Sequence, residues 1–313
     1  MSVRGSLVTS FARAIDRGSR VAERSSRDRH NLDVVLQWAL QRIGSRTVLF
    51  PGAYIELLRS CLEQTRLTIT DVKVDPRAPS DLSGRRFSSL VEALRQLPPV
   101  EFSTAAEIAL VADSYRGNLT PIEVHEWTGD VGSLFEISSC KGKKGRILTT
   151  IVRFTRSSQC LELGTAYGMS ALFVLEALKA GDAAARLTTL EGWDLLFSLS
   201  SPMLTARHGN RVSCRLGSTQ DALPGLVKSL GPLDFVFHDA GHSRDDYVRD
   251  FLAILPGVRP GAVVLIDDIR WEDPRFFQGT PRCYEGWLEL VNHPRVQRAV
   301  EIDGAMGLLL VGG

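Results

Sequence analysis

Short apolar segments alternate with longer helical stretches through the second half of this 313-residue chain. Five such segments lie at 159–164, 187–191, 211–216, 233–239 and 262–268. This alternation predicts parallel strands joined by crossover helices, with helices on both faces of one sheet. We therefore expect a doubly wound α/β domain over residues 136–313.

The last two apolar segments follow a different pattern. Val296 to Ile302 and Met306 to Val311 are separated only by Asp303-Gly304-Ala305. A connection this short predicts a tight hairpin, which adds two antiparallel strands at one edge of the five parallel ones. The hairpin and the absence of a Gly-x-Gly-x-x-Gly loop argue against a nicotinamide-dependent dehydrogenase.

Composition narrows the class of protein and its partners. The 44% hydrophobic and 23% charged fractions are typical of a soluble globular protein. A net charge of +1 gives no overall attraction to nucleic acid or to a membrane. No apolar run approaches the roughly 18 residues that span a bilayer. The five cysteines show no paired spacing, so neither a zinc site nor a disulfide framework is expected, and a cytoplasmic location is favoured.

Residues 1–135 carry no recognisable catalytic signature and are predicted to be mostly helical. Apolar residues recur at helical spacing within 32–43, 55–62, 87–97 and 104–115. We expect an accessory region that either forms a homodimer contact or covers the substrate. Arginines and serines in the first 30 residues could resemble an organellar transit peptide, but the acidic residues among them favour a helical tail.

A strand, a glycine turn and a helix start follow one another in residues 160–171. Gly164 and Gly168 permit the tight turn, and Ser170 opens an apolar helix. Such an element brings backbone N–H groups and a helix N-terminus close to a ligand. Glu162 would repel a pyrophosphate there but attract a cation. We therefore expect a positively charged nucleoside, and S-adenosylmethionine is the obvious candidate.

Polar side chains also end the other four parallel strands, at the edge where doubly wound sheets bind ligands. A carboxylate after the second strand suits the two ribose hydroxyls of a nucleoside. Polar residues after the third could bond an adenine edge. In chain order these residues are Glu191, then Ser218, Thr219 and Gln220, then Asp239, then Asp267 and Asp268.

Residues 141–270 resemble the catechol O-methyltransferase-like branch of class I S-adenosylmethionine-dependent methyltransferases. Three segments carry the resemblance: Lys-Gly-Arg-Ile-Leu (144–148), Leu-Glu-Leu-Gly-Thr-Ala-Tyr-Gly-Met-Ser-Ala (161–171) and Gly-Ser-Thr-Gln-Asp-Ala-Leu-Pro (217–224). The family has a Rossmann-like sheet with a C-terminal antiparallel hairpin, as expected here. The match covers roughly half of the chain and does not reach residues 1–135.

The resemblance implies where the cofactor would lie. Gly164 and Ser170 would face its methionine part, Glu191 its ribose, and Thr219 and Gln220 its adenine. The full expected set of cofactor-contacting residues is Glu162, Gly164, Thr165, Ala166, Tyr167, Gly168, Ser170, Glu191, Gly192, Trp193, Ser218, Thr219, Gln220, Asp239 and Ala240.

The resemblance also implies a divalent cation, usually magnesium, at the fourth and fifth strand ends. Asp239, Asp267 and Asp268 stand at these positions. Magnesium prefers oxygen ligands, and three converging carboxylates would repel one another without a cation. In the alternative, one aspartate caps a helix and another pairs with Arg244 or Arg270.

His242 departs from the family pattern, because metal-dependent relatives commonly place a lysine there as a base near the substrate hydroxyl. Histidine is a competent base near neutral pH. It could equally be a metal ligand or fix the loop. His238 directly precedes Asp239 in a strand, so its side chain should point to the opposite face of the sheet.

Taken together, these features predict an O-methyltransferase that acts on a hydroxyl of a small molecule. Asp239, Asp267 and Asp268 would hold a cation, with Asp239 and His242 as the catalytic pair and Trp271 lining the acceptor site. Catechols, sugars and other natural-product hydroxyls stay open as substrates. The alternatives are a metal-independent methyltransferase that uses His242 alone, and a non-catalytic scaffold with the same fold.

Overall fold

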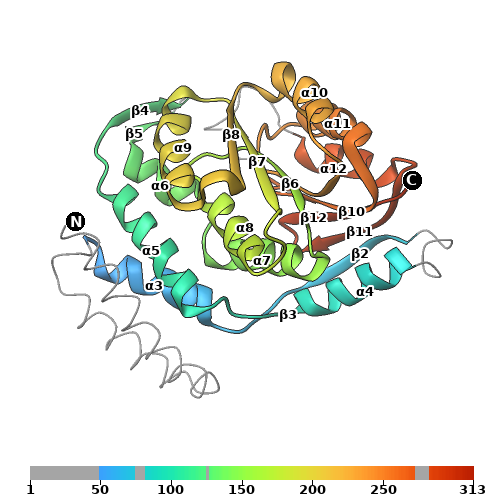
Figure 1. Cartoon of the computed structure of the whole chain (residues 1–313), viewed down its shortest axis with the longest axis horizontal. Helices are drawn as coiled ribbons and strands as arrows, with labels where there is room; N and C mark the ends of the chain where they lie inside the picture. Colours follow the sequence, from blue (N-terminus) through green and yellow to red (C-terminus); the bar gives the residue numbers. More distant parts are fainter. Residues whose placement is uncertain (1–48, 75–81, 125–126, 272–281) are drawn as a thin grey trace. The chain divides into compact units, whose positions relative to one another are not determined.

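The computed structural model describes residues 49–74, 82–124, 127–271 and 282–313 (Figure 1). The predicted helix within 32–43 and the arginine-rich tail lie outside these residues. Contacts divide the chain into two compact units. The larger contains the described residues of Arg66–Leu97, Val124–Trp127 and Ile147–Gly313, and the smaller contains the other described residues.

An eight-stranded sheet forms the centre of the larger unit. Five neighbouring strands are parallel, and the C-terminal hairpin continues the sheet with antiparallel pairing. This architecture confirms the predicted doubly wound α/β fold. In sheet order the strands are β2 (Ile69–Val74), β11 (Val296–Ile302), β12 (Met306–Val311), β10 (Val258–Ile266), β9 (Leu233–His238), β6 (Gln159–Leu163), β7 (Arg186–Glu191) and β8 (Val212–Leu216).

Strand β2 was not expected, because it lies in the region predicted to be mostly helical. It pairs antiparallel with β11, with Ile69 opposite Ile302 and Val74 opposite Arg298. Its sequence, Ile-Thr-Asp-Val-Lys-Val, has no regular apolar alternation, and no residue of the strand is fully buried. Short, charged strands are typical of sheet edges, where they limit unwanted pairing. Such a strand gives little periodic signal.

Helices cover both faces of this sheet (Figure 1). Successive side chains of a strand point to opposite faces, and in β6 and β9 nearly all of them are buried, so both faces need cover. Leu161 and Leu163 of β6 share a hydrophobic core with Tyr247 and Phe251 of α11. Glu162 lies between these two leucines in the strand and therefore faces the other side. The helices of this part are α4 (Leu82–Arg95), α7 (Gly142–Thr155), α8 (Met169–Lys179), α9 (Asp194–His208), α10 (Thr219–Ser229), α11 (Arg244–Ile254) and α12 (Cys283–Asn292).

The smaller unit is built mainly from α3 (Pro51–Leu62), α5 (Phe102–Arg116) and α6 (Val131–Ser138). The guanidinium of Arg146 is fully buried and donates to the carbonyl oxygens of Ser60 and Glu63, so it satisfies the C-terminal end of α3. Two short strand pairs complete the described chain, β1 (Thr65–Arg66) with β3 (Gln96–Leu97) and β4 (Pro121–Val124) with β5 (Trp127–Asp130).

The contact units differ from the predicted boundary after residue 135, since Arg66–Leu97 groups with the sheet. The accessory role of residues 1–135, as a lid or a homodimer contact, stays a prediction. Among the described helices, none has both the length and the apolar character that crossing a membrane requires.

Candidate cofactor and metal site

The turn after β6 approaches the end of β9 so closely that it requires glycine. Gly164 has φ of 89°, and a Cβ built on it would lie 2.0 Å from the carbonyl oxygen of Asp239. Its N–H donates to the carbonyl oxygen of Leu190 at 2.9 Å. The N–H of Asp239 donates to the carbonyl oxygen of Leu163 at 2.8 Å. Three strand ends are therefore held together at this edge of the sheet.

The rest of the turn is held by hydroxyl groups and by left-handed backbone. Thr165 and Thr189 place their hydroxyl oxygens 2.5 Å apart. Ala166 has φ of 43°, and Gly168, the N-cap of α8, has φ of 76°. The side chains of Tyr167 and Ser170 are buried. The turn is thus preformed, with the N-terminus of α8 directly behind it.

Glu162 is a fully buried carboxylate beside this turn. Its neighbour across the sheet, Thr189, donates its hydroxyl to Oε2 at 2.5 Å. The other oxygen, Oε1, is also buried and accepts no hydrogen bond of good geometry from a described residue. Burial raises the pKa of Glu162 to about 8, the hydroxyls of Ser170 and Thr189 oppose this rise, and the nearby acids Asp239 and Glu191 add to it.

This raised pKa predicts a specific pH dependence of stability. In the unfolded chain Glu162 ionises near its ordinary value of 4.5, whereas in the folded chain it keeps its proton up to about pH 8. Unfolding therefore releases a proton in this window, and stability falls as pH rises, by at most about 1.4 kcal/mol per pH unit. We expect Glu162→Gln to remove this part of the fall.

Urea-unfolding midpoints of the cofactor-free protein between pH 5 and pH 9 measure the effect. The exposed Glu123→Gln serves as the matched control and should follow the wild-type curve. If the midpoints of wild type and Glu162→Gln fell in parallel as pH rises, the raised pKa of Glu162 would be contradicted.

Glu191 ends β7 and joins two loops. Its Oε2 accepts the N–H of Ala166 at 2.6 Å, and its Oε1 accepts the N–H of Trp193 at 2.9 Å. Burial raises the pKa of Glu191, and these backbone donors, with those of Gly192 and Thr165, oppose the rise. A carboxylate has about four acceptor sites, so ribose hydroxyls could still bind it. Trp193 itself is 43% exposed.

The predicted adenine-binding residues lie where β8 passes into α10. Ser218 caps the helix, since its hydroxyl accepts the N–H of Asp221 at 3.1 Å. The hydroxyl of Thr219 accepts a hydrogen bond from Arg249 at 3.0 Å. Gln220 is exposed. Their contact with an adenine stays a prediction.

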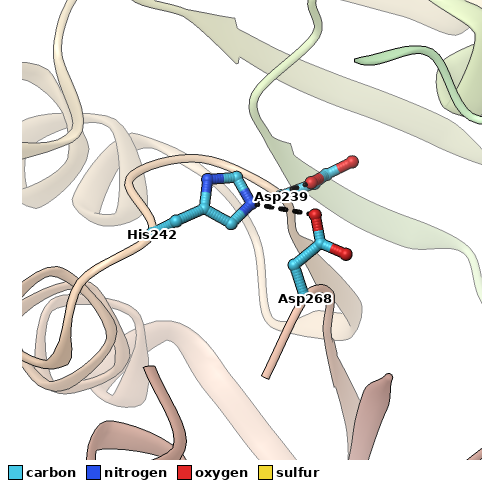
Figure 2. Close-up of side chains that lie close together, drawn as sticks. All are labelled: Asp239, His242 and Asp268. Carbon is cyan, nitrogen blue, oxygen red and sulfur yellow. Dashed lines mark ion pairs between the residues drawn. The ribbon is translucent and has the colours of Figure 1, made fainter. Parts of the chain in front are cut away.

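Asp239, His242 and Asp268 form the candidate metal site (Figure 2). One ligand atom of each residue lies within 4.8 Å of the others. His242 Nε2 is 3.4 Å from Asp239 Oδ1 and 3.6 Å from Asp268 Oδ2. Two carboxylates and an imidazole can together hold a divalent cation.

This group differs from the predicted trio, because His242 stands in it where Asp267 was expected. The side chain of Asp267 is fully buried, and its Oδ1 accepts the N–H of Asp268 at 2.9 Å. Successive residues at a strand end point in different directions, and Asp268 also adopts a left-handed φ of 53°. Asp267 therefore supports the loop in this structure, and its role as a ligand stays a prediction.

The two arginines that could have neutralised the trio are engaged elsewhere. Arg244 pairs with Glu289 at 2.5 Å and with Asp245 at 2.7 Å. Arg270 pairs with Glu301 at 2.7 Å. Both arginines thus have acidic partners outside the trio.

Opposing influences set the protonation of His242. Burial lowers its pKa, but Asp239, Asp268 and Asp267 raise it by more, so the net pKa is above the ordinary value. The ring of Trp271 packs edge-on against the imidazole, with centroids 4.6 Å apart. The carboxylates thus favour the protonated imidazole. Charge compensation at Asp239 and Asp268 would lower this pKa and increase the fraction of neutral imidazole that can accept a proton.

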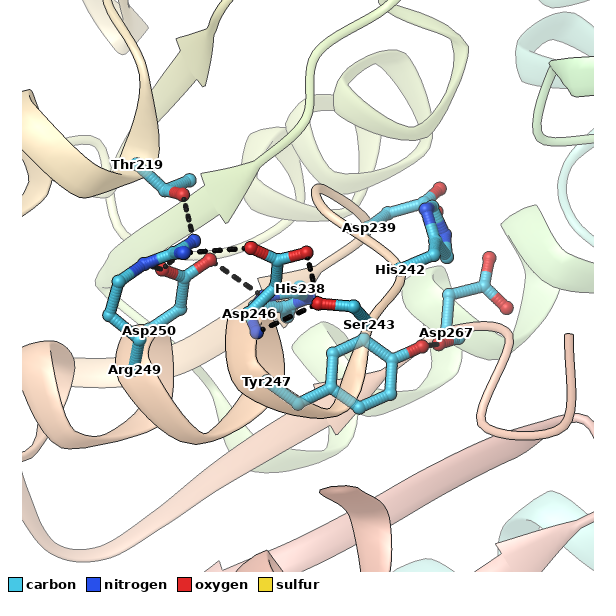
Figure 3. Close-up of polar contacts among 10 residues, drawn as sticks. All are labelled: Thr219, His238, Asp239, His242, Ser243, Asp246, Tyr247, Arg249, Asp250 and Asp267. Atoms are coloured by element: carbon cyan, nitrogen blue, oxygen red, sulfur yellow. Dashed lines mark hydrogen bonds and ion pairs between the residues drawn. The ribbon is translucent and has the colours of Figure 1, made fainter. Parts of the chain in front are cut away.

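Several supporting residues were missed in the sequence (Figure 3). Tyr247 donates its hydroxyl to the carbonyl oxygens of Asp267 and Asp268 at 2.8 and 3.2 Å. Ser243 caps α11 by accepting the N–H of Asp246. The spacing Ser-x-x-Asp directly after His242 is a helix-start signal that could have been used.

His238 lies away from the metal group, as strand alternation predicts. Its Nε2 is 3.0 Å from Asp250 Oδ2, and its ring packs edge-on against Tyr247. Both partners belong to α11.

Comparisons with known proteins find methyltransferases. A family model described as a methyltransferase domain matches residues 161–269. Catechol O-methyltransferase of Mus musculus is 34% identical over 149 residues, which are 46% of this chain and 51% of that protein. The Sus scrofa enzyme of the same name is 34% identical over 132 residues, 41% of this chain and 68% of that protein.

The chain spans only about half the length of the mouse and bovine relatives. Among solved structures, an O-methyltransferase from Bacillus cereus in complex with SAH has a TM-score of 0.51 at 18% identity, covering 73% of this chain and all of that one. This likeness supports the fold.

Proposed function

Since this chain belongs to the catechol O-methyltransferase-like branch of class I S-adenosylmethionine-dependent methyltransferases, we propose that it moves a methyl group from S-adenosylmethionine to a hydroxyl of a small molecule. The observation that carries the proposal is the buried carboxylate of Glu162, beside a preformed glycine turn and close to the Asp239 group. A binding scaffold would not need all of these parts.

The residues of the turn fit a cationic nucleoside. A buried carboxylate is costly unless it is protonated or paired. Oε1 of Glu162 lacks a hydrogen-bond partner of good geometry among the described residues, so a cation placed there would remove a cost. Glu191 would accept the ribose hydroxyls, and Thr219 and Gln220 would contact the adenine. The sulfonium supplies the reactive methyl group and leaves as a neutral thioether.

Asp239 and Asp268 fit a divalent cation, and magnesium is proposed because it prefers carboxylate ligands. His242 completes the group either as a third ligand or as the base. A bound cation would lower the pKa of a coordinated hydroxyl. Asp267 would keep the loop of Asp268 in place through the hydrogen bond to its N–H.

The remaining steps fall to the protein. A phenol with a pKa near 10 is only about one thousandth ionised at pH 7, a deficit of roughly 4 kcal/mol. We infer that His242 Nε2 takes the hydroxyl proton, as the new oxygen–carbon bond forms and the carbon–sulfur bond breaks. Alignment of the two reactants can supply about 7–11 kcal/mol more. Trp271 packs against His242 and would limit access of water to it.

Mass spectrometry of the reaction products tests the function. The full chain is incubated with methyl-labelled S-adenosylmethionine, magnesium and either catechol or a sugar with neighbouring hydroxyls. We expect labelled monomethyl catechol together with an equal amount of S-adenosylhomocysteine. Cofactor binding without any methylated product from either acceptor would contradict the proposed hydroxyl chemistry. Full activity in EDTA would favour the metal-independent alternative with His242 alone.

A further inference from the structure

We propose that Arg249 is a positioning residue that couples the adenine-binding segment to the Asp239 and His242 site. The inference rests on the proposed function. One guanidinium contacts Thr219 at the start of α10, Asp246 at the start of α11 and Asp250 further along α11 (Figure 3). Asp250 in turn contacts His238, so the third contact reaches the end of β9 indirectly.

The first branch reaches the cofactor side. Arg249 Nη2 donates to the hydroxyl of Thr219 at 3.0 Å. Thr219 is the first residue of α10 and follows the Ser218 cap. A change in the position of this segment therefore acts directly on the guanidinium.

The second branch reaches the turn that carries His242. Arg249 Nη1 is 2.7 Å from Asp246 Oδ1, and Asp246 Oδ2 accepts the hydroxyl of Ser243 at 2.6 Å. Ser243 follows His242 directly in the chain. The turn also packs tightly on this carboxylate, because a Cβ on Gly241 would lie 2.6 Å from Asp246 Cγ.

The third branch reaches the end of β9. Arg249 Nε donates to Asp250 Oδ1 at 2.9 Å, and Asp250 Oδ2 is 3.0 Å from His238 Nε2. Asp250 is fully buried, so it depends on Arg249 for compensation of its charge. His238 directly precedes Asp239, so this branch ends at the backbone of a proposed metal ligand.

Only arginine can make all three contacts at once. Its guanidinium is planar and offers five donors in a fixed fork, whereas a lysine ammonium acts as a point charge. Arg249→Lys keeps the charge near Asp250 but cannot hold Thr219 and Asp246 at the same time. The coupling should therefore be lost while much of the charge compensation is retained.

The test combines Thr219→Val, Arg249→Lys and the double variant of the full chain. Nuclear magnetic resonance of the histidine rings gives a readout that needs no turnover, and His242→Gln identifies the resonance of His242. Thr219 begins α10, whereas His238 ends β9 and His242 lies just before α11, yet we expect Thr219→Val to shift both resonances. In the Arg249→Lys background the same change should shift neither.

Turnover at saturating cofactor gives the second readout. The loss of turnover in the double variant should be about 2- to 100-fold smaller than the product of the losses in the two single variants. Arg259→Lys is the matched control, because Arg259 pairs at 2.6 Å with another buried aspartate, Asp234, at the opposite end of β9. It should lower the melting temperature without moving the His242 resonance.

The outcomes separate this inference from the proposed function. If Thr219→Val leaves the His242 resonance unchanged in the wild-type background, or shifts it equally beside Arg249→Lys, the coupling is wrong even in an active enzyme. If the wild type shows no turnover but the resonances respond as expected, the function fails and the coupling stands. Should Arg249→Lys not fold, Thr219→Val and Ser243→Ala in the wild-type background still decide the question.

Discussion

Replacing Asp268 with alanine is expected to lower methyl transfer by about 100- to 1,000-fold, the range found when one preorganised electrostatic group is removed from an active site. Asp268 supplies one of the two carboxylates of the candidate metal site, 3.6 Å from His242 Nε2. It does not belong to the turn that would bind the cofactor. Calorimetry should therefore find the affinity for S-adenosylmethionine nearly unchanged.

Asp268→Asn is the informative companion variant. Asparagine tolerates the left-handed φ of 53° at this position and keeps one oxygen ligand, so its loss should be smaller than that of alanine. EDTA should reproduce the alanine result in the wild type, and added magnesium should reverse it. Asp245→Asn is the control, because the Asp245 carboxylate is 84% exposed. Wild-type turnover in Asp268→Ala would contradict the metal site.

Gly164→Ala is expected to abolish cofactor binding. The added Cβ would lie 2.0 Å from the carbonyl oxygen of Asp239, a backbone atom that cannot move without shifting β9. The φ of 89° adds strain for any residue with a Cβ. To relieve this contact, either the turn moves away from the end of β9 or the backbone of Asp239 shifts. We expect a loss of at least about 100-fold in affinity for S-adenosylmethionine, equal to roughly 2.7 kcal/mol.

Gly209→Ala separates the effect of the close contact from the effect of the positive φ. Gly209 also has a positive φ, 55°, but no atom lies within 4 Å of the added Cβ. It should cost some stability and leave cofactor affinity as it is. Equal affinities for Gly164→Ala and wild type, measured by calorimetry, would show that the turn is not the binding wall.

Most strands of the parallel sheet could be predicted because they are buried on both faces and bounded by clear turns, whereas β8 at the edge is partly exposed. Every predicted strand from 159 to 311 corresponds to an observed one. The positions of Glu162 and Glu191 at the carboxyl edge of the sheet could be predicted for the same reason, since a strand end followed by a glycine turn fixes them, and their contact with a cofactor stays a prediction. The local sequence is enough to predict an element when residues close to it in the chain determine where it begins and ends.

Features that depend on partners distant in the chain could not be predicted. Strand β2 exists because β11 offers it an edge, some 230 residues away. In this structure His242, and not Asp267, groups with Asp239 and Asp268, and the left-handed φ of Asp268 turns the two neighbouring carboxylates apart. Arg249 looks like an ordinary helix-surface residue in the sequence, and only the fold brings Thr219 to it.

The central claim is that the edge of the sheet around Glu162 and Glu191 binds S-adenosylmethionine. Titration calorimetry of the full chain, with S-adenosylmethionine and with NAD in separate runs, tests it most directly. We predict one S-adenosylmethionine site per chain, lost in Gly164→Ala, and no heat from NAD. Absence of S-adenosylmethionine binding at millimolar concentration, or binding of NAD in its place, would contradict the account.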